Sequence, residues 1–104
     1  MNRAAVPEID VHEAYRRSTA GAARLLDVRE ADEWALGRAP TAQHLPMSTL
    51  DPAAVPTDGP ILLICHLGGR SAMVAGQLAA AGFDVTNVAG GMDAWEAAGL
   101  PVTA

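Results

Sequence analysis

The hydrophobic positions of this chain change their period several times, which divides it into short strands and short helices. Residues 61–64 form a continuous apolar run, typical of a parallel strand that is buried on both faces. After Ser71 the apolar residues recur at helical spacing, and Gly82 follows as a C-terminal cap. The residues with this spacing are Val74, Leu78 and Ala81. The pattern therefore predicts a strand, a short loop and a helix in succession.

The remainder of the chain alternates in the same way. The expected strands are residues 8–10, 23–28, 42–45, 61–65 and 84–89. The other expected helices are residues 10–17, 29–37 and 92–98. Asp10, with Glu13 three residues later, has the form of a capping box, and Gly90 is expected in a tight turn before the last helix. The proline-rich segment 47–60 reads mostly as a connection with one helical turn.

Strands that alternate with helices predict an α/β domain with a mostly parallel central sheet and helices on both of its faces. The chain has 104 residues, of which 50% are hydrophobic, so residues 1–104 are expected to form one domain around one core. In such sheets the functional site lies at the carboxyl ends of the strands. Cys65 falls at that position.

Charge and cysteine content exclude several classes of protein. The seven basic residues are all arginine, scattered along the chain, and twelve acidic residues give a formal charge of −5, so nucleic-acid binding is not expected. The longest apolar run is too short to span a bilayer, and no secretory signal is recognisable, so no membrane association is expected. A single cysteine cannot form an internal disulfide, which favours a reducing, cytoplasmic location.

The cysteine loop carries the strongest candidate chemistry. Four residues, two of them glycines, separate Cys65 from Arg70, so the loop can turn its amides inward and bring the guanidinium round to face the sulfur. The amides and the following helix start would stabilise a thiolate. The alternative is that Cys65 is a small, inert residue at the end of a buried strand. Ser71 is either a helix N-cap or a hydrogen-bond partner of the sulfur.

Three motifs in order resemble those of the single-domain rhodanese (thiosulfate sulfurtransferase-like) family, over nearly the whole chain. The first is 25–30 with Glu33, Trp34 and Gly37, the second is the loop 65–71, and the third is 82–88 with Gly90, Gly91, Ala94 and Trp95. The resemblance implies a five-stranded parallel sheet and a catalytic Cys65 that carries sulfur as a persulfide. The residues it implies for holding the anionic donor and the persulfide are His66, Leu67, Gly68, Gly69, Arg70 and Ser71.

By the same resemblance, Cys65 takes sulfur from a donor such as thiosulfate, Arg70 neutralises the donor's sulfonate, and a thiol, a protein or, in vitro, cyanide accepts the sulfur. No metal or organic cofactor is implied. Two alternatives stay open. The first is a phosphatase or arsenate reductase of the same fold, although those related enzymes carry one more residue between cysteine and arginine. The second is a non-catalytic rhodanese-like interaction module, although such modules commonly lack the cysteine.

Several further residues of the motifs are expected to have structural roles. Asp27 and Arg29 match the aspartate-valine-arginine signature, and an ion pair or cap that supports the loops near the site is favoured over a catalytic role. Trp34 and Trp95 are expected in core or edge packing. Arg38 departs from the family pattern, and a solvent-facing side chain is favoured over a place at the mouth of the site.

The histidines are not expected to bind a metal. His12 and His44 have neither a second cysteine nor an acidic cluster nearby, so a satisfied or solvated side chain is favoured for each. His66 follows the nucleophile directly and is expected to line the loop without acting as a general base.

Overall fold

The structure is a computed structural model that describes residues 6–104, so the first five residues of the expected 1–104 domain lie outside the described residues. Its strands are β1 Glu8–Ile9, β2 Arg24–Asp27, β3 Ala42–His44, β4 Ile61–Ile64 and β5 Val85–Val88. Its helices are α1 Val11–Thr19, α2 Ala31–Leu36, α3 Gly69–Ala80 and α4 Gly91–Ala97, and two short 3-10 turns lie at Met47–Thr49 and Pro52–Ala54.

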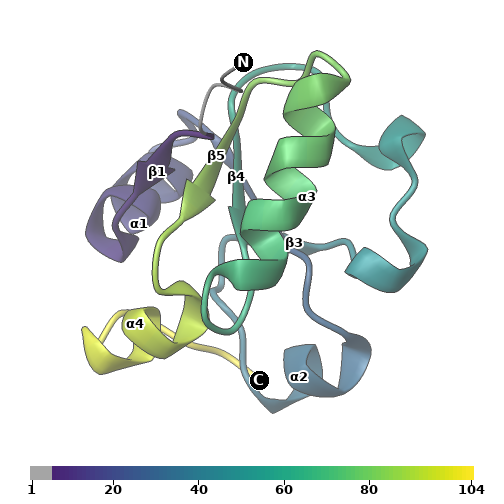
Figure 1. Ribbon diagram of the computed structural model, residues 1–104. Helices are drawn as coiled ribbons and strands as arrows, with labels where there is room; N and C mark the ends of the chain where they lie inside the picture. The colour runs from purple at the N-terminus through teal and green to yellow at the C-terminus, as the bar shows by residue number, and fades with distance from the viewer. Residues whose placement is uncertain (1–5) are drawn as a thin grey trace.

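The five strands form one sheet in the order β1-β5-β4-β2-β3, and every neighbouring pair is parallel (Figure 1). The expected α/β class and the five-stranded parallel sheet are therefore confirmed. Because all strands point the same way, their carboxyl ends meet at one edge, and the segment that follows β4 begins with Cys65. The central position of β4 explains why its four residues are apolar and buried on both faces.

Helices cover both faces of the sheet, as the alternation predicts. Helices α1 and α4 pack on one face, where the buried cluster includes Val11, Ala14, Met92 and Trp95 together with residues of β2 and β4. Helix α3 packs on the other face, where Val74 and Leu78 meet the opposite side of the same strands. Figure 1 shows α3 in front of the sheet beside β4, and α2 at the lower end of the molecule, where the segment between β4 and α3 also lies.

The capping box predicted at the start of α1 forms only in part. The Asp10 carboxylate accepts a hydrogen bond from the Glu13 backbone N–H at 2.8 Å, as a cap should. The Glu13 carboxylate instead binds Arg16 and Arg17 one turn further along the helix. A complete capping box occurs at α2, between Glu30 and Glu33.

The boundaries of α3 also differ from the expectation. The helix begins at Gly69, two residues before Ser71, because the tight loop already adopts helical geometry there. It ends at Ala80, and Ala81 is exposed, so only Val74 and Leu78 of the expected apolar stripe are buried.

None of the helices in residues 6–104 is long and apolar enough to cross a membrane. Within the same residues, no group of three or more His, Cys, Asp or Glu side chains is placed to hold a metal ion.

Candidate active site

The sulfur of Cys65 lies at the bottom of the loop that joins β4 to α3. The residue is only 1% exposed, and it packs in the same apolar cluster as Leu63 and Val74. The loop residues that follow it, His66 and Leu67, are exposed. The loop therefore wraps a buried sulfur beneath a solvent-facing rim.

Three hydrogen bonds converge on this sulfur. The backbone N–H groups of Gly68 and Ser71 lie 3.1 Å and 3.3 Å from Cys65 Sγ, and the Ser71 hydroxyl lies 3.2 Å from it. Burial alone would raise the pKa of the Cys65 thiol. The hydrogen bonds from Ser71, Gly68 and Leu67 outweigh it, so the pKa falls below its usual value. Ser71 is thus a partner of the sulfur, and the N-cap of α3 is Gly68.

Two glycines allow the loop to adopt this shape. Gly68 has a φ of +103°, which a residue with a side chain rarely adopts. Gly91, at the start of α4, has a φ of +58°, and a Cβ there would lie 2.4 Å from the carbonyl oxygen of Cys65. That close approach lets the N–H groups of Met92 and Asp93 donate to the carbonyls of Cys65 and His66 at 2.7 Å and 2.9 Å. The α4 N-terminus therefore fixes the base of the cysteine loop.

Asn87 supports the loop from the sheet, and the sequence patterns did not single it out. It is 1% exposed in β5, and its Nδ2 donates to the carbonyl of Gly68 at 3.2 Å and to the Glu8 carboxylate at 2.9 Å. Its Oδ1 is buried and has no hydrogen-bond partner among the described residues. The available signal was an asparagine, a residue type depleted in strands, within the strand that precedes the Gly90-Gly91 turn.

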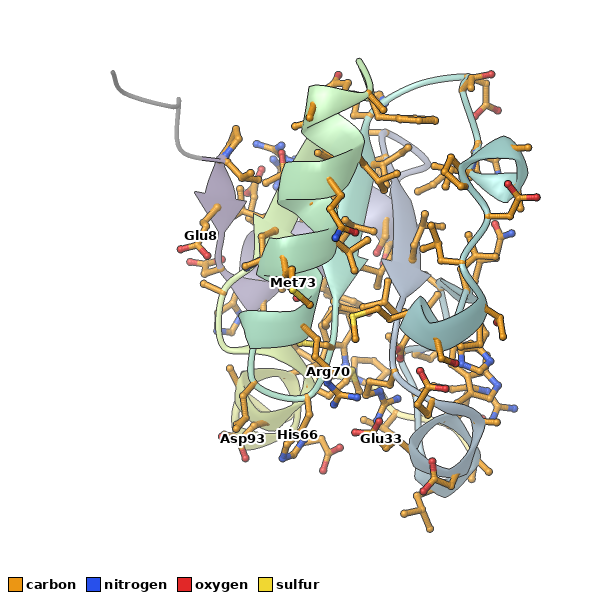
Figure 2. All side chains as sticks on the ribbon, turned by 45° about the vertical axis from the view of Figure 1, so that its right-hand side comes forward. Glu8, Glu33, His66, Arg70, Met73 and Asp93 are labelled. Carbon is orange, nitrogen blue, oxygen red and sulfur yellow. The ribbon has the colours of Figure 1, made fainter. Side chains whose placement is uncertain are left out.

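Arg70 forms a bidentate ion pair with Glu33 of α2. Its Nη1 and Nη2 each donate to one Glu33 carboxylate oxygen at 2.7 Å, and Figure 2 shows the two side chains pointing toward each other. Hydrogen bonding from Arg70 lowers the pKa of Glu33 to about 2, and the pair raises the pKa of Arg70. The Arg70 guanidinium was expected to face the sulfur, but both of its Nη atoms donate to Glu33 instead.

Asp27 and Arg29 form the ion pair that was favoured for them. Both are buried, and the Arg29 Nη2 lies 2.8 Å from the Asp27 carboxylate and 2.7 Å from the carbonyl of Gly37. The Arg29 carbonyl in turn accepts a hydrogen bond from His44 Nε2 at 2.7 Å. This pair therefore joins the end of β2 to the segment after α2 and to the end of β3.

The remaining candidate residues have packing roles. Trp34 stacks on His44 with ring centroids 4.5 Å apart, and the Arg38 guanidinium lies 4.8 Å from the centroid of the Trp34 ring. Arg38 is half-buried and donates to the Trp34 carbonyl, so it is not the solvent-facing side chain that was favoured. Trp95 is fully buried in the core, and His12 is exposed.

A pocket of about 340 Å³ lies beside the loop. Its lining residues are Arg29, Glu33, Leu36, Gly37, His66 and Glu96. His66 is an exposed residue of the loop that also lines this pocket. Gly69 is the first residue of α3, and the space where a Cβ would lie is open.

These features define an α/β protein with a buried, hydrogen-bonded cysteine at the carboxyl ends of its strands. The model of the rhodanese-like domain family matches residues 10–98. The chain belongs to the rhodanese-like domain family, which includes sulfurtransferases and also phosphatase-like and non-catalytic members.

Solved structures agree with this assignment. A rhodanese-related protein of Thermoplasma volcanium is similar with a TM-score of 0.86 and 29% identity, covering 93% of this chain and 97% of that one. A rhodanese-like domain protein of Staphylococcus aureus matches with a TM-score of 0.78 and 32% identity over 86% of this chain and 91% of that one. The reduced Bacillus anthracis CoADR-RHD matches with a TM-score of 0.81 and 32% identity, over 86% of this chain but only 16% of that one.

Proposed function

We propose that this protein is a sulfurtransferase that carries a sulfane sulfur on Cys65. The observation that carries the proposal is the convergence of three hydrogen-bond donors on Cys65 Sγ, at 3.1 to 3.3 Å, which lowers the pKa of the thiol. A thiolate, not a thiol, is the nucleophile that sulfur chemistry needs. The same donors can hold the terminal sulfur of a persulfide, since it too is a soft anion.

The reaction has two steps. The Cys65 thiolate attacks the outer sulfur of thiosulfate, the sulfur–sulfur bond breaks, and sulfite leaves with the bonding electron pair, so that a Cys65 persulfide anion remains. A thiophilic acceptor, a thiol in the cell or cyanide in vitro, then removes the outer sulfur and regenerates the thiolate. The backbone of residues 66–71 cradles the transferred sulfur, and Arg70 lies beside the loop in its ion pair with Glu33. This reaction uses no metal or organic cofactor.

The acceptor must be a second molecule. Cys65 is the single cysteine of the sequence, so no thiol of this chain can resolve the persulfide. The partners we propose are therefore a small-molecule sulfur donor and a sulfur acceptor that is either a small molecule or a protein thiol. Thiolate and persulfide chemistry of this kind suits a reducing compartment such as the cytoplasm.

Phosphatase activity is the less favoured reaction for this loop. Gly68 and Ser71 direct their N–H groups at the sulfur itself, and four residues separate Cys65 from Arg70, one fewer than in the phosphatase-type loop described above. A loop closed so tightly on the sulfur suits a single sulfur atom better than a tetrahedral phosphate. The buried, hydrogen-bonded thiol likewise has no evident purpose in a module that only binds partners.

Steady-state assays separate these activities. Wild-type protein should form thiocyanate from thiosulfate and cyanide, and Cys65→Ser should not, while neither should hydrolyse a phosphate ester at a comparable rate. Phosphate-ester turnover that matches sulfur transfer and is lost in Cys65→Ser would establish the phosphatase instead. Absence of both activities in a folded wild-type protein would favour the interaction module.

A further inference from the structure

The guanidinium of Arg70 is already occupied by a carboxylate. Both Nη atoms donate to Glu33 at 2.7 Å, and the two side chains are 34% and 30% exposed. This fork matches a carboxylate in the same way that it would match a sulfonate. An anionic donor such as thiosulfate would therefore have to displace Glu33 before Arg70 could bind it with both nitrogens.

The lining residues of the pocket beside this ion pair offer no uncompensated guanidinium. The Arg29 guanidinium is bound to Asp27 and to the Gly37 carbonyl. Glu96 lines the pocket and forms no ion pair within residues 6–104. Negative charge therefore predominates at the opening, on a chain whose formal charge is −5.

The rim of the opening is also apolar. Leu36, which lines the pocket, is 87% exposed, and Leu67 of the cysteine loop is 66% exposed. Large apolar side chains that stay exposed beside a reactive group often contact a ligand. A ligand group held in this pocket meets Leu36 and the unpaired carboxylate of Glu96.

We propose that Glu33, by holding Arg70, is a specificity-determining residue that selects a low-molecular-weight organic persulfide with an uncharged carrier over sulfonate-bearing donors. This inference rests on the sulfurtransferase function proposed above. The Cys65 thiolate attacks the outer sulfur of R–S–SH, the sulfur–sulfur bond breaks, and the electron pair leaves with R–S⁻. The proton stays on the transferred sulfur, so Cys65–S–SH forms with no net oxidation or reduction.

Charge explains the preference. Thiosulfate brings two negative charges toward a thiolate whose neighbouring cation is compensated, and like charges in this range of distances repel strongly at a protein surface. The protonated form R–S–SH, which is the form that the thiolate attacks, brings no such repulsion, and its organic carrier can contact Leu36. The pocket volume of about 340 Å³ is enough for a small carrier.

The test measures the rate at which Cys65 acquires one sulfur atom, by rapid quenching and intact mass spectrometry, with thiosulfate and with 2-hydroxyethyl persulfide as donors. The informative variant is Glu33→Gln, which keeps the side-chain size and an oxygen that can accept from the Glu30 N–H. The matched control is Glu96→Gln, which removes a negative charge from the same pocket without releasing Arg70. Thermal melting checks that each variant is folded.

We expect Glu33→Gln to speed loading from thiosulfate at least about tenfold, the scale of one removed charge near a protein surface. Loading from hydroxyethyl persulfide should change less than about twofold, and Glu96→Gln should change loading from thiosulfate less than about threefold. In the wild type, added salt should speed loading from thiosulfate by screening the repulsion, which tests the charge argument without a variant.

Several outcomes would overturn the proposal. One is a rate of loading from thiosulfate that is unchanged or lower in Glu33→Gln, and another is an equal increase in the loading rate for both donors. A third is a Glu96→Gln variant that speeds loading from thiosulfate as much as Glu33→Gln does. The last is a wild-type rate of loading from thiosulfate that falls as salt is added. If the wild type accepts sulfur from neither donor, the sulfurtransferase function fails, and that result differs from a failure of donor selection alone.

Discussion

The Ser71 hydroxyl can be removed without disturbing any other side chain of the site, so Ser71→Ala isolates one of the three donors to the sulfur. In the wild type this hydroxyl lies 3.2 Å from Cys65 Sγ and 3.3 Å from the Gly68 carbonyl, between which its single proton is shared. The two backbone donors, Gly68 N–H and Ser71 N–H, stay in place in the variant.

The expected change in the pKa of Cys65 follows from the energy of a hydrogen bond to a charged group, about 1.5–3 kcal/mol. Sulfur is a diffuse acceptor and the proton is shared, so we take the lower limit. One pKa unit corresponds to about 1.4 kcal/mol, so the pKa of Cys65 should rise by about one unit in Ser71→Ala. A higher pKa means a smaller thiolate fraction at neutral pH, and slower loading with sulfur.

The assay is the rate of alkylation by iodoacetamide as a function of pH, whose midpoint reports the thiol pKa. Ser18→Ala is the matched control, since its hydroxyl bonds to the Tyr15 carbonyl and to Thr41, away from the sulfur. A midpoint in Ser71→Ala that coincides with those of the wild type and of Ser18→Ala would show that the hydroxyl does not stabilise the thiolate.

Three further predictions concern the supports of the site. Asp27→Asn leaves the buried Arg29 without its counter-ion and should lower the free energy of unfolding in urea by about 3–5 kcal/mol, whereas a loss below about 1 kcal/mol would refute the supporting role. Gly91→Ala places a Cβ against a loop carbonyl at a φ of +58° and should cost more than about 3 kcal/mol, while Gly76→Ala, with open space around it, should cost nothing or stabilise α3 by up to about 1 kcal/mol. The pKa of Glu33 is about 2, below its ordinary 4.5, so its ion pair with Arg70 stabilises the fold above about pH 4.5 and is lost as the pH falls toward 2. The difference in the free energy of unfolding between wild type and Glu33→Gln should therefore shrink over that range, and a constant difference would contradict the role of the ion pair.

The elements of the fold could be predicted because each one has a local cause. The apolar run that becomes β4, the Asp10 cap of α1 and the glycines around α4 are all short-range patterns. The errors were of one or two residues at the ends, as at α3, where the loop enters helical geometry before the apolar spacing begins.

The partners within the site could not be predicted in the same way, because they depend on the order of strands. Arg70 and Glu33 are 37 residues apart, and their pairing needs β2 and β4 to be neighbours. Asn87 reaches Gly68 only because β5 lies on the other side of β4. The spacing between Cys65 and Arg70 predicts that Arg70 lies near the sulfur. It contains no information about Glu33, whose carboxylate on α2 binds the guanidinium instead.

Whether Cys65 carries sulfur is decided by the intact mass of the protein after incubation with a sulfane-sulfur donor, thiosulfate or hydroxyethyl persulfide, beside Cys65→Ser under the same conditions. We expect one added sulfur atom on the wild type, removed by a reducing thiol or by cyanide, and none on the variant. An unmodified wild type with both donors, or an equal adduct on Cys65→Ser, would contradict the assignment of Cys65 as the sulfur carrier.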